Sequence, residues 1–150
     1  MKIQTAHFGE VEIDEQNILT FEKGLPGLEE DKRYALLSNR ESHPISWLQS
    51  LDRKEIALPV IDPFVLCPDY SFDIDQEDVE KLEIEEVKDV YVLCILVIPS
   101  NINAMTINLA APVIINVNIK KGCQIILDDR RYRVRFPISE LLDKYQKGRE

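Results

Sequence analysis

The stretch VYVLCILVI, residues 90–98, is apolar on both alternating faces and rich in β-branched side chains. A membrane-spanning helix needs about 20 apolar residues, so this run is far too short to cross a bilayer. A short apolar run of this composition is typical of a strand that is covered on both faces. The stretch therefore predicts the central strand of a sheet, with Cys94 as a small core side chain.

Shorter segments of strand-like composition, separated by turn residues, lie on both sides of this stretch. We expect strands at residues 3–8, 11–13, 18–21, 34–37, 45–51, 56–61, 70–74, 105–109, 113–119, 124–127 and 132–136. Such a series predicts an all-β fold, a small antiparallel β-barrel or sandwich-like single domain over residues 1–150, with one or two short helices.

Two segments have helical spacing. Residues 76–82 predict a short acidic helix with Asp75 as N-cap, and Ser139 could cap a terminal helix that runs to about residue 146 and ends near Gly148. Residues 120–122 (Lys-Lys-Gly) predict a turn. Pro59 and Pro112 lie within strand-like runs, and because proline cannot donate to a sheet ladder, each should mark an edge or a bulge.

The negative charge is concentrated in one part of the chain. The formal net charge is −9, and the segment from Asp69 to Asp89 carries ten acidic residues against two lysines. Such a field repels phosphate backbones and attracts cationic surfaces. The composition thus favours a basic protein partner over nucleic acid, although a charge run can also serve only to keep a surface hydrated.

Residues with reactive side chains form no recognisable catalytic or metal-binding pattern. His7 and His43 have no partner at ligand spacing, no glycine-rich phosphate loop is present, and no serine stands in a nucleophile signature. Asp62 is the best lone acid–base candidate, but an Asp-Pro pair is also a common turn element. We therefore expect no enzyme activity, no metal and no cofactor.

The basic stretch RRYRVR, residues 130–135, interleaves Tyr132 with arginines, as some single-strand binders do. Read as a strand, it places Arg131, Arg133 and Arg135 on one solvated face. The net negative charge of the chain argues against direct RNA binding, and the arginine face could instead pair with the acidic segment.

The stretch INLAAPVIIN, residues 107–116, has an asparagine near each end and no reactive group. We expect Asn108 to fix a bend where strand pairing stops. Asn116 and Asn118 should share a strand face opposite the apolar residues 115, 117 and 119. These amides could contact a partner, or they could serve only as turn and surface residues.

Taken in order, several stretches resemble the flagellar assembly factor FliW family of bacteria. They are FEKGLPGLEE (21–30), ISWLQSL (45–51), VIDPF (60–64), DYSFDI (69–74), INLAAPVIIN (107–116) and CQIIL (123–127). The family more often has Ile and Phe where this chain has Leu25 and Leu28, which puts a contact at that loop in doubt but not the fold.

The resemblance implies a cytoplasmic, non-enzymatic protein that acts as a chaperone of flagellin. When free of flagellin, it would bind the translational regulator CsrA away from its RNA site and relieve repression of flagellin synthesis. A small-ligand-binding or enzymatic β-barrel is the alternative. The side chains we expect at a partner surface come from the early loop, the acidic segment and the asparagine set: Leu25, Pro26, Leu28, Asp73, Asp75, Glu77, Asp78, Glu80, Glu83, Asn108, Asn116 and Asn118.

Overall fold

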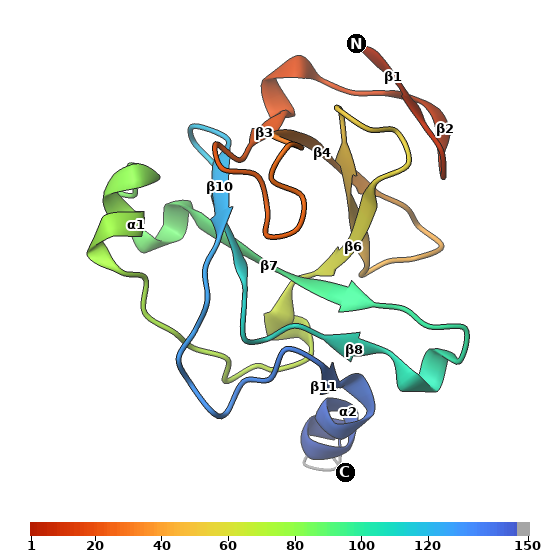
Figure 1. Cartoon of the computed structure of the whole chain (residues 1–150). Helices are drawn as coiled ribbons and strands as arrows, with labels where there is room; N and C mark the ends of the chain where they lie inside the picture. The colour runs from red at the N-terminus through yellow and green to blue at the C-terminus, as the bar shows by residue number, and fades with distance from the viewer. Residues whose placement is uncertain (147–150) are drawn as a thin grey trace.

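The computed structural model describes residues 1–146, and its strands close into a seven-stranded barrel. The ring runs β7-β6-β5-β4-β3-β10-β9 and returns to β7, with the other strands attached outside it (Figure 1). The strands are β1 (Lys2–Thr5), β2 (Gly9–Glu12), β3 (Leu19–Thr20), β4 (Arg33–Ser38), β5 (Ser46–Ser50), β6 (Ala57–Ile61), β7 (Val90–Val97), β8 (Thr106–Ile107), β9 (Val113–Asn116), β10 (Lys121–Gln124) and β11 (Phe136–Pro137).

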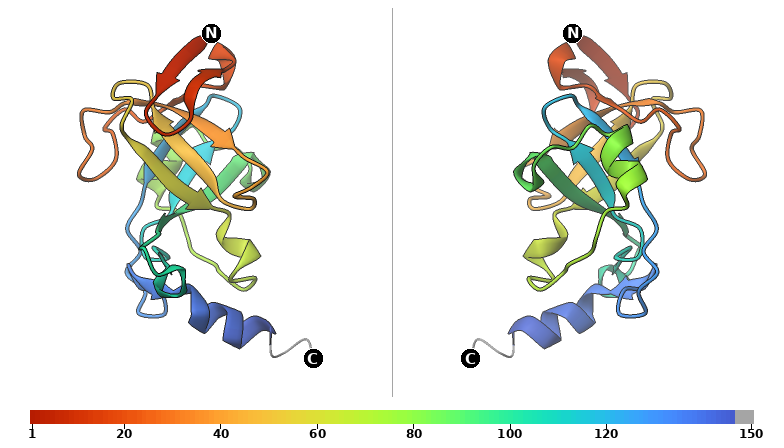
Figure 2. Two further views of the ribbon diagram at one scale, coloured as in Figure 1. Left: turned by 90° about the vertical axis from the view of Figure 1, so that its right-hand side faces the viewer. Right: turned by 90° about the vertical axis from the view of Figure 1, so that its left-hand side faces the viewer.

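Two α-helices and four 3-10 turns complete the described part of the chain. They are α1 (Gln76–Lys81), α2 (Ile138–Gln146), η1 (Glu15–Asn17), η2 (Pro63–Val65), η3 (Val87–Asp89) and η4 (Ile102–Ala104). The hairpin β1–β2 and helix α2 lie at opposite ends of the molecule, while α1 stands beside β10 on one flank (Figures 1 and 2).

Strand β7 is central, as its two apolar faces predict. It pairs with β6, β8 and β9, and its inward side chains meet the others in a packed barrel interior. Because apolar side chains fill this interior, it is a core and not a ligand cavity. Its buried residues are Leu19, Phe21, Leu25, Tyr34, Leu48, Val60, Leu93, Val113 and Ile115.

A second core covers the outer face of the β7–β9 wall. The side chains of Cys94 and Ile114, which point out of the barrel, are buried beneath irregular segments and the two helices. These covering residues include Tyr70, Leu82, Ile125, Tyr132 and Leu141. The protein thus has a filled barrel with a second hydrophobic layer packed on the outside of one wall. The acidic segment is part of this second layer.

The all-β barrel and its short helices are confirmed, with one departure from a purely antiparallel arrangement. Strand β10 pairs with β3 in parallel through Lys121 and Thr20, which closes the ring. Pro59 pairs with Trp47 but has no partner on β7, where the ladder begins at Val60, and Pro112 stands just before β9. Each proline therefore lies just outside the ladder that its strand forms with β7.

Two predicted strands are wrong. Residues 70–74 keep their alternating burial but have no ladder partner, because alternation reports which side chains are buried and not which backbones pair. Residues 132–136 begin in a turn, and only Phe136 joins a strand, β11, opposite Ile107.

Other predicted boundaries also differ from the structure, and the strand predicted at residues 124–127 is displaced, because β10 covers Lys121–Gln124. The turn after β9 falls at residues 117–120, with Lys120 at φ 57°, and β10 begins at Lys121. Gly122 lies inside β10, where an added Cβ would come within 2.7 Å of the Phe21 ring. Helix α2 already begins at Ile138, so Ser139 is not its N-cap, and Gly148 lies outside the described residues.

Candidate functional site

The acidic segment presents most of its carboxylates to solvent. Asp73, Asp75, Glu77, Glu80 and Glu83 are exposed, and Asp78 is half-buried. Asp75 occupies the N-cap position of α1, as predicted, but its side chain makes no capping hydrogen bond. The one ion pair within the helix joins Glu77 to Lys81 at 2.8 Å, and it lowers the pKa of Glu77. Among the described residues, the other carboxylates of this set form no ion pair.

Helix α1 ends in a left-handed residue that is not glycine. The Ile84 N–H donates to Val79 O at 2.9 Å, and the Glu83 N–H donates to Glu80 O at 3.1 Å. These are the two hydrogen bonds that define a Schellman motif. Glu83 adopts φ 52° at the position that glycine usually takes. This stop turns the chain back to the barrel after only six helical residues.

Asn116 holds this helix end against the barrel. Its Nδ2 donates to Leu82 O at 2.8 Å and to Glu83 O at 3.2 Å, while its Oδ1 accepts the Asn118 N–H. The side chain is 2% exposed, so it offers no surface to a partner. The expected partner-facing position of Asn116 is thus corrected, because its side chain faces the underside of α1 and not solvent.

The other two asparagines also have defined places. The Asn108 Oδ1 accepts the Ala111 N–H at 3.0 Å, which fixes the bend between β8 and β9 as predicted. Asn118 is exposed, but it lies in the turn after β9 and does not share a strand face with Asn116. Among the three asparagines, Asn118 alone presents its side chain openly to solvent.

The early loop, residues 21–31, is folded back onto the barrel. Gly24 and Gly27 have φ values of +66° and +86°. An isolated antiparallel β-bridge joins Leu25 to Leu28. Leu25 is only 1% exposed because it fills the open end of the barrel core, so the expected surface contact by this side chain is corrected. Leu28 is half-buried against the same core, which leaves Pro26 as the exposed apolar residue of the loop.

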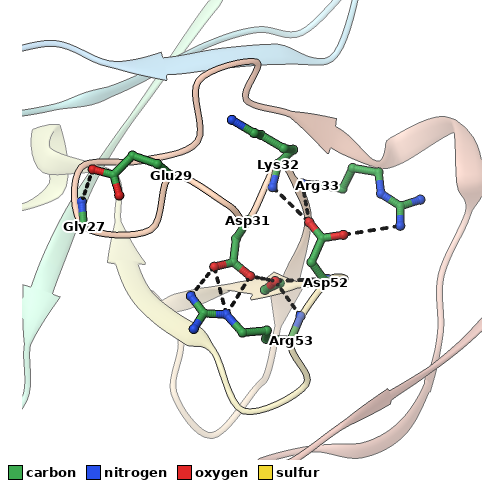
Figure 3. Close-up of polar contacts among 8 residues, drawn as sticks. Gly27, Glu29, Asp31, Lys32, Arg33, Asp52 and Arg53 are labelled. Carbon is green, nitrogen blue, oxygen red and sulfur yellow. Dashed lines mark hydrogen bonds and ion pairs between the residues drawn. The ribbon is translucent and has the colours of Figure 1, made fainter.

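A buried carboxylate ties this loop to the β5–β6 connection (Figure 3). Asp31 is 1% exposed and accepts the Ser50 hydroxyl at 2.8 Å. The Arg53 guanidinium forks onto both carboxylate oxygens, with Nε 3.1 Å from each, and its hydrogen bonds hold the pKa of Asp31 below its usual range. The end of the loop is therefore fixed by a charged bond network.

A groove lies between the loop, the acidic segment and the chain that follows β10. Its volume is about 910 Å³ and it is open to solvent. Acidic side chains outnumber basic ones along it, which gives the groove a net negative lining. The charged lining residues are Glu22, Glu29, Asp73, Asp75, Asp78, Asp128 and Asp129 against Lys23, Lys81, Lys121 and Arg131.

The structure brings only part of the predicted site together at this groove. Pro26, Asp73, Asp75 and Asp78 line it, while Glu77, Glu80 and Glu83 lie on other parts of the α1 surface. Sequence reasoning missed the far wall, in particular Ile126 and the pair Asp128 and Asp129. An isoleucine that is 81% exposed beside two aspartates departs from the usual burial of this residue type, but exposure is not visible in sequence alone.

The arginine stretch does not form a stacking platform. Arg131 pairs with Asp129 at 2.8 Å and Arg133 with Glu140 at 2.6 Å, so the pairing partners are local and not the acidic segment. Tyr132 is buried, accepts the Ser71 N–H at 3.1 Å, and packs edge-on against Tyr70. Its ring is thus committed to the second core and unavailable to a nucleic-acid base.

The remaining candidates for a catalytic or metal-binding role are the lone acid Asp62 and possible groups of metal ligands. Asp62 accepts the Phe64 N–H at 2.9 Å and begins η2, which is the turn role of an Asp-Pro pair. Across residues 1–146, no group of three or more His, Cys, Asp or Glu side chains is arranged to hold a metal ion. Within the same residues, no helix has the length and hydropathy to cross a membrane.

Fold and surface together define a small, filled β-barrel that bears an acidic external groove. The chain belongs to the FliW family of flagellar assembly factors, whose sequence model, described as FliW protein, matches residues 2–138. The flagellar assembly factor FliW of Caldicellulosiruptor saccharolyticus is 46% identical over 141 residues, which cover 94% of this chain and 92% of that protein. The corresponding protein of Thermoanaerobacter pseudethanolicus is 43% identical, with 95% of each chain covered.

A solved structure agrees with this assignment. The crystal structure of a flagellar assembly factor FliW superposes with a TM-score of 0.85 and 36% sequence identity, and covers 92% of this chain and 96% of that one. The resemblance carried by the sequence stretches is thereby confirmed, including the barrel fold. The relatives are named as assembly factors and not as enzymes.

Proposed function

We propose that this protein is a cytoplasmic factor that switches between two polypeptide partners, flagellin and the translational regulator CsrA. It holds flagellin as a chaperone before export. When flagellin is scarce, the free protein binds CsrA and relieves repression of flagellin synthesis. Membership of a family of flagellar assembly factors supports the flagellar part of this proposal.

The exposed carboxylates of the α1 surface are the observation that carries the choice of a basic partner. A protein that binds RNA must present Lys and Arg to phosphates, so CsrA has to carry a cationic surface. Acidic side chains opposite such a surface accelerate encounter and select against acidic competitors. The exposed carboxylates supporting this role are Asp73, Asp75, Glu77, Glu80 and Glu83.

Switching requires that one partner weakens the binding of the other. If flagellin lowers the affinity for CsrA by some factor, CsrA must lower the affinity for flagellin by the same factor, because the two equilibria are linked. Overlapping footprints or two linked conformations would both give this result. In either case, the level of unexported flagellin sets how much CsrA is held.

Co-purification with each partner separately, followed by competition, tests the proposal. We expect tagged protein to capture purified flagellin and purified CsrA in separate experiments, and added flagellin to reduce the captured CsrA. A titration in the opposite order should give the same coupling factor. Failure to capture either partner, or simultaneous capture with unchanged affinities, would refute the switch.

A further inference from the structure

We propose that the groove receives an extended, basic polypeptide segment, which pairs as an added strand with residues 124–128. This inference rests on the proposed function in one respect, namely that the partner is a polypeptide. It goes further because it names the backbone groups that bind and the chemistry of the segment that they accept.

The chain after β10 has one satisfied edge and one open edge. The Ile125 N–H donates to Pro112 O at 3.0 Å and the Leu127 N–H donates to Ala110 O at 2.7 Å, both toward the barrel. In an extended chain, successive N–H groups point in opposite directions, so those of Ile126 and Asp128 point away from these bonds. Within residues 1–146, neither of these two N–H groups has a hydrogen-bond partner.

In the part of the chain that the structure describes, no neighbouring strand covers this open edge. Strand β3 pairs with β10 only at Lys121 and ends there. The groove is lined by every residue from Lys121 to Asp129. The edge thus lies along the wall of the groove, where an incoming strand would reach it, and this is the geometry of β-strand addition.

The opposite wall of the groove is also extended. Phe72 and Ile74 turn their side chains toward the second core, while Ser71 and Asp73 face solvent. In the described part of the chain, the N–H groups of residues 72–74 have no partner, and the Ser71 N–H is held by Tyr132. Phe72 and Asp73 of this stretch line the groove, so both walls carry backbone N–H groups without partners, and edges of this kind pair readily with another chain.

The charged side chains of the groove lining that form no ion pair determine which kind of polypeptide segment fits the groove. Glu22 pairs with Lys121 at 2.9 Å, and Asp129 pairs with Arg131, so these charges are already balanced. Among the described residues, the lining acids without an ion pair are Glu29, Asp73, Asp75, Asp78 and Asp128, against Lys23 alone as an unpaired cation. A segment with Lys or Arg at alternate positions complements this lining, whereas a phosphate backbone is repelled by it.

The exposed side chain of Ile126 specifies the other alternate positions. It is 81% exposed and stands between the buried Ile125 and the half-buried Leu127 of the same strand-like segment. An apolar residue on the incoming strand could cover it, as cross-strand pairs do. The expected ligand is thus a segment in which apolar and basic residues alternate.

The test uses the full chain and a capped peptide that alternates lysine and valine, with a glutamate–valine peptide of equal length as its counterpart. Peptide binding is followed by NMR titration, and amide hydrogen exchange is measured for each residue. We expect the basic peptide to bind and to slow exchange at Ile126 and Asp128, while the acidic peptide does not bind. Equal binding of both peptides, or bound peptide with unchanged exchange at these two amides, would overturn the inference.

Two variants of Ile126 distinguish the contribution of its backbone N–H to peptide binding from the contribution of its side chain. Ile126→Pro removes the outward N–H and leaves the inward donors of Ile125 and Leu127, so it should weaken the basic peptide by at least about fivefold, the loss of one hydrogen bond. Ile126→Thr keeps the N–H and removes the apolar contact, and should weaken binding less. Circular dichroism checks that each variant is folded, and the exchange measurement on the unaltered chain stands if proline disturbs the fold.

Experiments on the same proteins distinguish a failure of this inference from a failure of the proposed function. If the unaltered chain captures flagellin and CsrA and Ile126→Pro captures both equally well, strand addition is refuted while the switch survives. If the chain captures neither protein but the basic peptide protects Ile126 and Asp128, the switch is refuted while the groove keeps its assigned ligand. Protection of these amides by a single-stranded RNA in place of the peptide would also overturn the inference.

Discussion

The side-chain amide of Asn116 donates to the main-chain oxygen of Leu82 at 2.8 Å, and so joins the last residue of β9 to the end of the acidic helix. A second bond from the same amide reaches Glu83 O. These bonds satisfy carbonyl groups that a helix end would otherwise leave without partners. The acidic surface is thus held in place by a buried neutral side chain of the barrel.

Replacing Asn116 should loosen the acidic helix. We expect Asn116→Asp to lower the free energy of unfolding by about 2 kcal/mol, because a carboxylate can still accept the Asn118 N–H but cannot donate to the two carbonyls. Amide exchange in residues 76–84 should rise more than exchange in the barrel. The control is Asn118→Ala at an exposed position, which should stay within about 0.5 kcal/mol of the unaltered protein. A uniform rise in exchange would contradict a local tie.

The left-handed residue at the end of α1 offers a stabilising change. Glu83 at φ 52° is strained by about 1–2 kcal/mol relative to glycine, and glycine loses part of that gain through the entropy of the unfolded chain. Glu83→Gly should therefore raise the free energy of unfolding by about 0.5–1 kcal/mol. Glu85→Gly, at a position without positive φ, should lower it, and urea denaturation of both variants distinguishes the two effects.

The two glycines of the early loop should respond unequally to the same substitution. At Gly27 an added Cβ meets nothing within 4 Å, so Gly27→Ala should cost only the left-handed strain, about 1 kcal/mol. At Gly24 it would lie 2.6 Å from Leu28 O and 2.7 Å from Glu29 Cα. Gly24→Ala should cost at least about 3 kcal/mol, since strain and overpacking add. Equal thermal midpoints for the two variants would refute this account of the loop.

Asp31 should make stability depend on pH in the acidic range. Its pKa is lowered by the Arg53 bonds, so the folded protein keeps this carboxylate charged at a pH where the unfolded chain, with a pKa of about 3.9, takes up a proton. The contribution is complete above that value and is lost as pH falls through the folded pKa.

We expect Asp31→Asn to lower the free energy of unfolding by about 2 kcal/mol at pH 7, through loss of charge-assisted bonds. The difference from the unaltered protein should shrink below about pH 4. Glu22→Gln, which removes the exposed pair with Lys121, should leave the thermal midpoint almost unchanged. An Asp31→Asn effect of the same size at pH 7 and pH 3 would contradict the role assigned to its charge.

The barrel strands were predictable where hydrophobic pattern and pairing coincide. Residues 90–98 have two apolar faces, and the structure places them at the centre of the sheet as β7. Residues 70–74 show the limit of this signal, since Tyr70 and Phe72 alternate with polar residues and yet pair with no strand. The sequence predicts a turn at Gly122, because a sequence alone does not reveal that the Phe21 ring approaches its Cα.

The negative charge of the candidate site could be predicted from the sequence, but the residues that form its groove could not. The carboxylates around α1 are exposed, as a dense acidic run predicts. Leu25 and Asn116 belong to the interior, which only the closure of the barrel determines. The strand predicted at residues 124–127 falls on the wall of the groove, but its open edge could not be predicted, because that edge depends on where β3 ends and on which N–H groups turn toward Pro112 and Ala110.

The rate at which CsrA associates with the acidic surface tests the central claim most directly. The variant Asp73→Lys, Asp75→Lys, Glu80→Lys reverses three exposed acids, two in the groove lining and one elsewhere on α1. The control Glu15→Lys, Glu41→Lys, Glu55→Lys changes the net charge equally at exposed sites elsewhere. Stopped-flow association at low salt should slow by about tenfold or more for the first variant and much less for the second, and high salt should remove the difference. Equal association rates for both variants and the unaltered protein would contradict the claim that this surface recognises the basic partner.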